Sequence, residues 1–129
     1  MTSSHIPASH LRLKRAYEPV EPGDGMRILI DRLWPRGVSK EQAALDDWMK
    51  EIAPSTALRQ WFGHDPALWP EFQRRYRAEL GQHPQELDRI RALAQTQVVT
   101  LVYGARDTEH NDAVVLHEVL LEPTAHART

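Results

Sequence analysis

Cysteine is absent from the 129-residue chain. Its absence excludes disulfide bonds, thiolate nucleophiles, and zinc or iron–sulfur sites that use cysteine ligands. The stability of the fold must therefore come from a packed core rather than from covalent cross-links. Any catalysis would need a group other than a thiol.

The chain also lacks long apolar segments and a strong charge of either sign. No apolar run approaches the roughly 20 residues that a membrane-spanning helix needs. The first residues, MTSSHIPASH, lack the basic-then-apolar layout of a signal peptide. A net charge of −2 gives no general attraction to nucleic acid or to an anionic membrane. We therefore expect a cytoplasmic protein with no membrane partner, and the composition indicates no particular oligomeric state.

Short β-branched runs predict the strands. Residues 28–30, within an expected strand at 27–31, and residues 98–103 are almost continuously apolar, which is typical of strands that are covered on both faces. Residues 10–15 alternate leucines with basic side chains and predict a half-exposed edge strand. Because helical segments separate the two apolar strands, we expect these strands to be parallel neighbours.

Capping signals and helical spacing predict the helices. Ser39 followed by Gln42 matches a capping box, so a helix is expected from about Lys40. Its buried face would consist of apolar residues at helical spacing, namely Ala44, Leu45, Trp48, Met49 and Ile52. Four further helices are expected near residues 56–62, 66–80, 84–94 and 113–120.

The predicted architecture is a single compact α/β domain at residues 10–122, with a small, mostly parallel sheet flanked by about five helices. No internal repeat or linker divides this segment. Residues 1–9 are polar and patternless, and residues 123–129 begin with a proline. Both ends are therefore expected to be loose tails.

Two polar loops follow the two apolar strands. The first, residues 31–37, has the sequence DRLWPRG, and the second, residues 104–111, has the sequence GARDTEHN. If the strands are parallel neighbours, their carboxyl ends meet at one edge of the sheet, so both loops lie on the same rim. In α/β proteins this rim is the usual place for a ligand.

Five segments cover most of the chain between residues 13 and 116: LKRAYEP (13–19), DGMRILIDRLWPRGVSKE (24–41), ALDDWMKEIAPSTALRQWFGHDP (44–66), FQRRYRAEL (72–80) and TLVYGARDTEHNDAVVL (100–116). In this order they resemble the YeaO-like branch of DUF488, a bacterial family classed as a domain of unknown function. The resemblance implies a small α/β domain and no settled activity. More distant relatives tend to carry a Cys-His-Arg turn after the last strand, where this chain has Gly104-Ala105-Arg106-Asp107. A thiol mechanism in those relatives would therefore not transfer.

Three arginines of the loops, Arg32, Arg36 and Arg106, are the residues that we expect to hold an anion. Guanidinium groups bind phosphate or carboxylate in a bidentate way, and each charge-assisted hydrogen bond is roughly twice as strong as a neutral one. The helix expected after the first loop would add the positive end of its dipole. The alternative is that Arg32 pairs with Asp31 or Asp46 while Arg36 lies in solvent.

Asp31 and His110 are the candidates for proton transfer. At a strand end, Asp31 can be a general base, a ribose ligand or the clamp of an arginine, and the sequence favours an orienting role. Since neighbouring strand residues face opposite sides, Asp31 and Arg32 can enter one pocket only where the strand has ended. His110 is the natural proton shuttle near neutral pH, although a loop histidine is more often simply exposed.

Trp34, Tyr103 and Asn111 complete the candidate ligand-binding set. Trp34 lies in the charged loop, where it either stacks on a base or sugar or closes the end of the sheet. Tyr103 ends the last strand and is a second stacking candidate. Asn111, or alternatively Asp107, would cap the final helix.

No metal site and no particular cofactor are predicted, although seven histidines are present. His110 and His117 share a helical face, but they lie about 10 Å apart along the axis at a rise of 1.5 Å per residue. A single ion with bonds near 2 Å cannot span that distance.

The leading functional hypothesis is a pocket at the carboxyl rim of the sheet that binds a small anionic molecule, such as a nucleotide or a phosphorylated metabolite. If the protein is an enzyme, a thiol-independent hydrolase or transferase is the class that fits. The alternative hypothesis is a non-catalytic module that binds nucleic acid or a protein through the same basic loop, with nucleic acid the less favoured partner.

Overall fold

The computed structural model describes residues 6–122. Its sheet has four parallel strands. β4 is the central strand in the order β1-β4-β2-β3 and pairs with both β1 and β2. The expected α/β class and parallel sheet are therefore confirmed. The strands are β1 (Leu11–Arg15), β2 (Met26–Leu29), β3 (Asp47–Trp48) and β4 (Val99–Tyr103).

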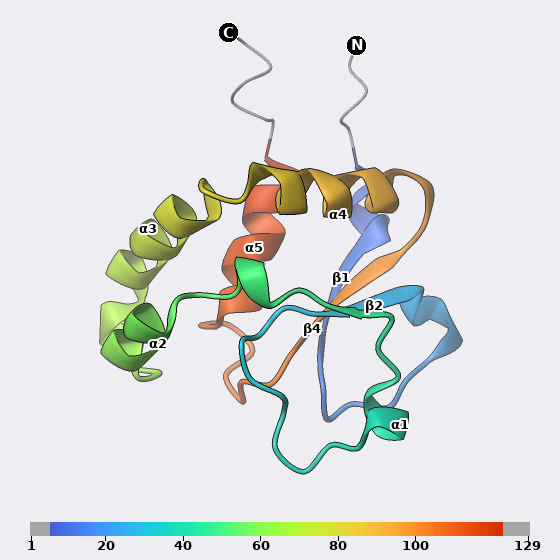
Figure 1. Ribbon diagram of the computed structural model, residues 1–129, viewed down its shortest axis with the longest axis horizontal. Coiled ribbons are helices and arrows are strands. Elements are labelled where there is room, and N and C mark those ends of the chain that lie inside the picture. Colours follow the sequence, from blue (N-terminus) through green and yellow to red (C-terminus); the bar gives the residue numbers. More distant parts are fainter. Residues whose placement is uncertain (1–5, 123–129) are drawn as a thin grey trace, which may run out of the picture.

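Five α-helices accompany the sheet within the described residues, as expected. Figure 1 shows α2, α3 and α5 on one side of the strands and α1 on the other. The helices are α1 (Lys40–Ala43), α2 (Thr56–Phe62), α3 (Trp69–Leu80), α4 (Pro84–Thr96) and α5 (Asp112–Leu121), and short 3-10 helices lie at Ala8–His10, Pro22–Asp24, Lys50–Ile52 and Pro66–Leu68. No helix in this part of the chain is both long and apolar enough to cross a membrane.

The main core lies between the sheet and helices α2–α5. Alternate residues of the strands point to this side, among them Ile28, Val99 and Leu101, each of which is fully buried. They pack in one cluster with helical residues such as Phe72 and Leu116. Burial of this kind contributes on the order of 2 kcal/mol for each large apolar side chain.

The opposite face of the sheet buries charge. Lys14 Nζ and Arg27 Nη1 donate to the Asp24 carboxylate at 3.1 and 2.7 Å, and the side chains of all three are at most 9% exposed. Burial alone would raise the pKa of Asp24, but hydrogen bonds from the Glu21 backbone, Lys14 and Arg27 outweigh it, so the pKa lies below its usual value. This triad joins β1 to β2 beneath β4, where Thr100 Oγ1 donates to the Asp24 carbonyl at 2.6 Å.

A connection without an α-helix, residues 16–25, carries the chain from β1 to β2 across this face. It ends at Gly25, whose φ is +63°. A Cβ atom at this position would lie 2.2 Å from the Val98 carbonyl oxygen, which accepts the Met26 N–H at 2.9 Å. Only glycine permits both this backbone conformation and this close approach.

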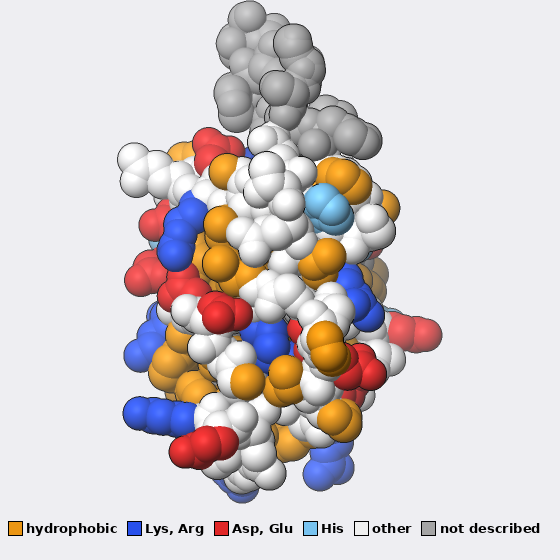
Figure 2. All heavy atoms as spheres, turned by 90° about the vertical axis from the view of Figure 1, so that its right-hand side faces the viewer, with side chains coloured by type: hydrophobic (Ala, Val, Ile, Leu, Met, Phe, Trp, Pro, Cys, Tyr) orange, Lys and Arg blue, Asp and Glu red, His pale blue; other side chains and the backbone are white. Residues whose placement is uncertain are grey.

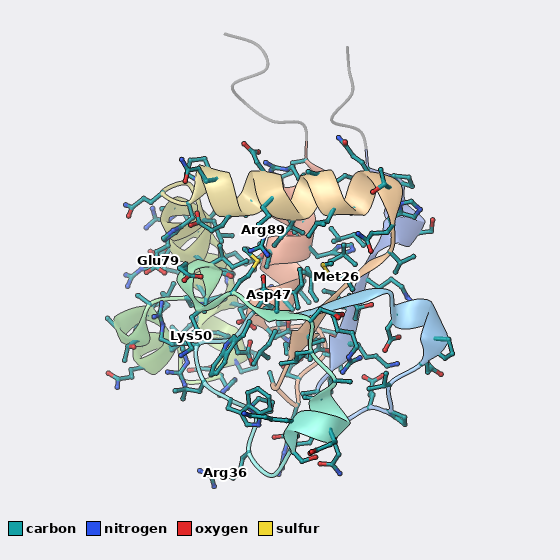
Figure 3. The ribbon with its side chains drawn as sticks, turned by 45° about the vertical axis from the view of Figure 1, so that its right-hand side comes forward. Met26, Arg36, Asp47, Lys50, Glu79 and Arg89 are labelled. Atoms are coloured by element: carbon teal, nitrogen blue, oxygen red, sulfur yellow. The ribbon has the colours of Figure 1, made fainter. Side chains whose placement is uncertain are left out.

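The prediction of one helix over residues 40–52 is wrong. Its capping box is present, since Ser39 Oγ accepts the Gln42 N–H, but α1 ends after one turn because Ala44 adopts the left-handed conformation with φ of 46°. Asp47 and Trp48 then pair with β2 as the edge strand β3. Arg89 of α4 lies over this edge, and its Nη2 is 2.7 Å from Asp47 Oδ2 (Figure 3).

The expected N-terminal boundary also needs correction. Ile6 is only 6% exposed and belongs to the main core, and Ala8–His10 form a 3-10 helix, so packed structure begins before residue 10. Hydrophobic burial explains the difference from the prediction, because Ile6 attaches this polar segment to the main core. The rest of the expected N-terminal tail, and the expected tail at residues 123–129, lie outside the described residues.

Candidate functional site

The two loops expected on one rim do meet. Asp31 Oδ2 accepts the N–H of Gly104 at 2.8 Å, although 73 positions separate these residues in the chain. β2 ends at Leu29, so the alternation of a strand no longer applies at Asp31 and Arg32. For this reason both residues line the same cavity at the carboxyl ends of β2 and β4.

The cavity has a volume of about 370 Å³, within the range of small-molecule sites. One wall is the first loop, residues 31–36, and the opposite wall comes from α2 and the residues just after it. Gly104 and the first residue of α5, Asp112, close the inner end. Phe62 and Phe72, whose rings stack with centroids 4.3 Å apart, supply an apolar surface.

A pair of carboxyl groups, Asp31 and Asp112, lies at this inner end. Burial of Asp112 and the neighbouring charge and hydrogen bond of Asp31 raise its pKa well above the ordinary value of 3.8. Two carboxyl groups that hydrogen-bond each other cannot both ionise cheaply, so the surroundings favour the neutral form of Asp112. Asp31 therefore has two structural contacts, with the Gly104 N–H and with Asp112, which fit the orienting role that the sequence favours.

Arg32, Arg36 and Arg59 bring positive charge to the cavity. The Arg32 guanidinium donates from Nε to the Pro54 carbonyl at 3.1 Å and from Nη2 to the Ala53 carbonyl at 3.4 Å. These contacts are to backbone rather than to the carboxylates that the alternative interpretation named. Arg36 is exposed, and Figure 3 shows it at the outer edge of the molecule.

Arg106 and His110, which were expected to take part, do not line the cavity. Arg106 is exposed on the second loop. His110 Nδ1 lies 2.9 Å from Asp107 Oδ2, and its ring meets the Trp69 ring edge-on with centroids 5.2 Å apart. The structure thus brings two of the three predicted arginines to the cavity and leaves the predicted proton shuttle in a contact with its own loop.

Three further predicted residues have well-defined contacts. Trp34 lines the cavity, but it also donates from Nε1 to the Val38 carbonyl at 2.7 Å and meets Trp48 edge-on, so it closes this end of the sheet. Asn111 caps α5, accepting the Val114 N–H, and it is also within the cavity lining. Tyr103 is buried outside the lining, and its burial raises the pKa of its hydroxyl.

Four ionisable residues of the cavity were not expected: Tyr17, Asp112, Arg59 and His64. Asp112 and Arg59 belong to helices whose spacing indicates only packing, and His64 follows a helix stop. For Asp112 the sequence does contain a signal for a place in the site. This residue directly follows Asn111, the cap of α5, at the end of the loop after β4. Within residues 6–122 no group of three or more histidine, aspartate or glutamate side chains could hold a metal ion.

Comparison with known proteins gives relatives over most of the chain. The chain is 48% identical over 111 residues to the uncharacterised protein YeaO of Escherichia coli K12, which covers 86% of this chain and 96% of that protein. It is 38% identical over 112 residues to the uncharacterised protein Rv3073c of Mycobacterium tuberculosis H37Rv, covering 87% of this chain and 94% of that protein. No solved structure matches the chain.

A family model matches residues 10–129, and its description is "Inactive DUF488-N3 subclade". The matched range includes both loops and every residue that lines the cavity. The chain therefore belongs to the DUF488 family.

Proposed function

We propose that the cavity binds a small anionic molecule, such as a nucleotide or a phosphorylated metabolite. The observation that carries the proposal is the balance of charge around the cavity. Its ionisable lining residues are three arginines, one histidine, one tyrosine and two aspartates. The three guanidinium groups outnumber the two carboxyl groups, and the raised pKa of Asp112 favours its neutral form and so adds to this excess of positive charge. An anion is the ligand that balances the excess.

We propose that the protein binds this molecule without converting it into a product. The description of the subclade as inactive supports this restriction. The contacts of His110 support it too, because a proton shuttle must reach its substrate, and this imidazole faces Asp107 and Trp69.

A surface for nucleic acid has less support. Binding to a polyanion needs basic side chains gathered in a patch or stripe. Figure 2 shows acidic and basic side chains interspersed among hydrophobic ones on the face that it views. The net charge of the chain, −2, also gives no long-range attraction to a polyanion.

Calorimetric titration with inorganic phosphate, ribose 5-phosphate and adenosine monophosphate tests the proposal. At least one of these should bind, and Arg59→Gln should weaken its affinity by about tenfold or more, since a hydrogen bond to a charged group contributes about 1.5–3 kcal/mol. Arg106→Gln is the matched control, because Arg106 is exposed on the same rim but outside the cavity.

Two results would overturn the proposal. One is equal loss of affinity in both variants, which would place the anion outside the cavity. The other is no binding of any of the three, together with salt-sensitive binding of a DNA or RNA oligonucleotide, which would favour the nucleic-acid module.

A further inference from the structure

We propose that Tyr17 is a stacking platform for the ligand, so that the cavity selects an anion that carries an aromatic ring, such as a nucleotide, over a phosphorylated sugar. The inference rests on the proposed function, because it assumes that the arginines of the same cavity hold the anionic group. It adds a site for a second, uncharged part of the same ligand.

The exposure of apolar side chains points to one part of the cavity lining. Among residues 6–122 the two most exposed large hydrophobic side chains are Leu33, at 59%, and Tyr17, at 46%. Single exposed hydrophobic residues are common on protein surfaces, but these two line one cavity. A ligand that covers them removes apolar surface from water, which favours a ligand with an apolar group of its own.

Tyr17 is more exposed than the three other large aromatic side chains of the lining. Phe62 and Phe72 are at most 5% exposed, because they belong to the main core. Trp34 is half-buried, and its Nε1 donates to the Val38 carbonyl at 2.7 Å, so it closes the end of the sheet. Tyr17 is therefore the aromatic residue with the free surface that a ligand can reach.

Contacts with both loops hold the Tyr17 ring in place. Its hydroxyl donates to the Arg36 carbonyl of the first loop at 2.9 Å. The Arg15 guanidinium lies over the ring, 4.9 Å from its centroid, and Arg15 Nε donates to the Ala105 carbonyl of the second loop at 2.8 Å. A side chain that is fixed before binding loses little conformational entropy when a ligand packs against it. The platform is thus formed in advance.

An aromatic ring is the apolar group that suits this platform. Aromatic rings pack against one another in defined geometries, and the stacking of a base on an aromatic side chain needs no hydrogen bonds to the base. Arg32, Arg36 and Arg59 line the same cavity and supply the positive charge. An aromatic phosphate therefore finds partners for its charge and for its ring in one cavity, whereas a sugar phosphate leaves the platform unused.

Calorimetric titration with adenosine monophosphate and ribose 5-phosphate tests the inference, because the two probes differ in the adenine base. The wild-type protein should bind adenosine monophosphate about tenfold more tightly, as expected for one stacked base. Tyr17→Ala should reduce this ratio of affinities to about two or less, whereas Tyr17→Phe, which keeps the ring, should preserve it. The ratio cancels any effect that either substitution has on the anion site itself.

Trp61→Ala is the matched control. Trp61 is also an exposed aromatic residue beside an arginine, with the Arg75 guanidinium 4.2 Å from its ring centroid, but it does not line the cavity. This variant should keep the affinity ratio of the wild type. Circular dichroism establishes that each variant is folded before its titration.

The outcomes separate this inference from the proposed function. If the wild type binds both probes equally and Arg59→Gln weakens both, the anion site stands and the stacking platform is overturned. The platform is also overturned if the ratio persists in Tyr17→Ala, or if Tyr17→Phe or Trp61→Ala loses it, because the Tyr17 ring would then not be its source. If neither probe binds to the folded protein, and inorganic phosphate does not bind either, both proposals fail.

Discussion

The pKa of Asp112 is raised because this side chain is desolvated beside a second carboxyl group, Asp31. Nothing in the residue type predicts this, since an aspartate at the first position of a helix is ordinarily ionised and favoured by the helix dipole. Here desolvation and the neighbouring carboxyl group outweigh the dipole. The same residue type shows the opposite behaviour at Asp107, where backbone N–H groups of Glu109 and His110 and the His110 side chain lower the pKa.

This contrast predicts opposite pH dependences for two asparagine variants. The folded protein keeps the Asp112 proton at pH values where the unfolded chain releases it, so this residue costs more stability as the pH rises above about 3.8. Asp112→Asn should therefore raise Tm relative to wild type by an amount that grows between pH 4 and pH 7. The pKa of Asp107 is lowered on folding, so its stabilising effect is present above about pH 3.8 and is lost as the pH falls towards the folded pKa. The Tm deficit of Asp107→Asn should therefore be nearly constant between pH 4 and pH 7 and should shrink below pH 4.

Differential scanning calorimetry at intervals from pH 3 to pH 7 measures both trends. A Tm difference for Asp112→Asn that stays constant or shrinks as the pH rises would contradict the raised pKa. The wild-type protein serves as the reference at each pH, and in Asp112→Asn the difference also includes the release of Asp31 from its neighbouring carboxyl group.

At the scale of elements, Ala44 decides where α1 ends. Its φ of 46° and ψ of 49° lie in the left-handed region, which costs a residue with a side chain roughly 1–2 kcal/mol. The turn that follows allows Asp46 Oδ2 to accept the Arg27 N–H at 2.8 Å and brings β3 beside β2. The strand edge is thus formed at the expense of a strained backbone position.

Ala44→Gly should stabilise the protein by about 0.5–1 kcal/mol, because glycine adopts this conformation without strain. The matched control is Ala92→Gly, at an exposed position inside α4, which should destabilise it by about 0.5–1 kcal/mol. Urea unfolding measures both values. If the two substitutions destabilise the protein alike, Ala44 does not hold a left-handed conformation in solution.

The elements that could be predicted are those whose local pattern agrees with their surroundings. The apolar run that ends in β4 and the capped segment that forms α2 both show their structure in a short window of sequence. The segment after Ala43 does not, because Leu45, Trp48 and Ile52 have helical spacing, yet they lie in the loop after α1, in the edge strand β3 and in a 3-10 helix. Pairing with β2 overrides the local preference there, and a short window does not contain that information.

The residues of the candidate site divide in the same way, into those that a short window of sequence reveals and those that it does not. Asp31, Arg32 and Trp34 were found because they lie in a loop that directly follows an apolar strand. Asp112 and Arg59 were missed because their place in the cavity depends on how α5 and α2 pack against the sheet. Their sequence context indicates ordinary helix surfaces.

At the scale of the whole molecule, the two faces of the sheet are held by different physical means. One face packs helices over a continuous apolar core, while the other buries the Lys14–Asp24–Arg27 triad beside a small apolar cluster that includes Leu29 and Val102. Buried charges contribute little net stability when paired, but removal of one partner leaves the others uncompensated. The triad spans β1 and β2, so its loss should affect the sheet as a unit.

Asp24→Ala should destabilise the protein by about 3–5 kcal/mol, since it leaves Lys14 and Arg27 without their shared carboxylate. Glu21→Ala is the control. Glu21 also contacts Lys14, at 2.9 Å, but its side chain is 64% exposed, so we expect a loss of less than about 1 kcal/mol. Guanidinium unfolding distinguishes the two, and equal small losses would show that the triad is not buried in solution.

The pH dependence of the Asp24 contribution has a definite sign. Its pKa is lowered on folding, so its stabilising effect is present above about pH 3.8 and is lost as the pH falls towards the folded pKa. The difference in stability between wild type and Asp24→Ala should therefore narrow on acidification below pH 4.

The position of β4 has a consequence for how the chain acquires its structure during synthesis. β1 and β2 are not neighbours, and each finds its hydrogen-bonding partner in the strand made last. Until residues 99–103 have left the ribosome, the first strand has no partner, and the second has only the two-residue edge strand β3. The nascent polypeptide must therefore carry its unpaired early strands through most of translation, and the sheet closes around the final strand in one late step.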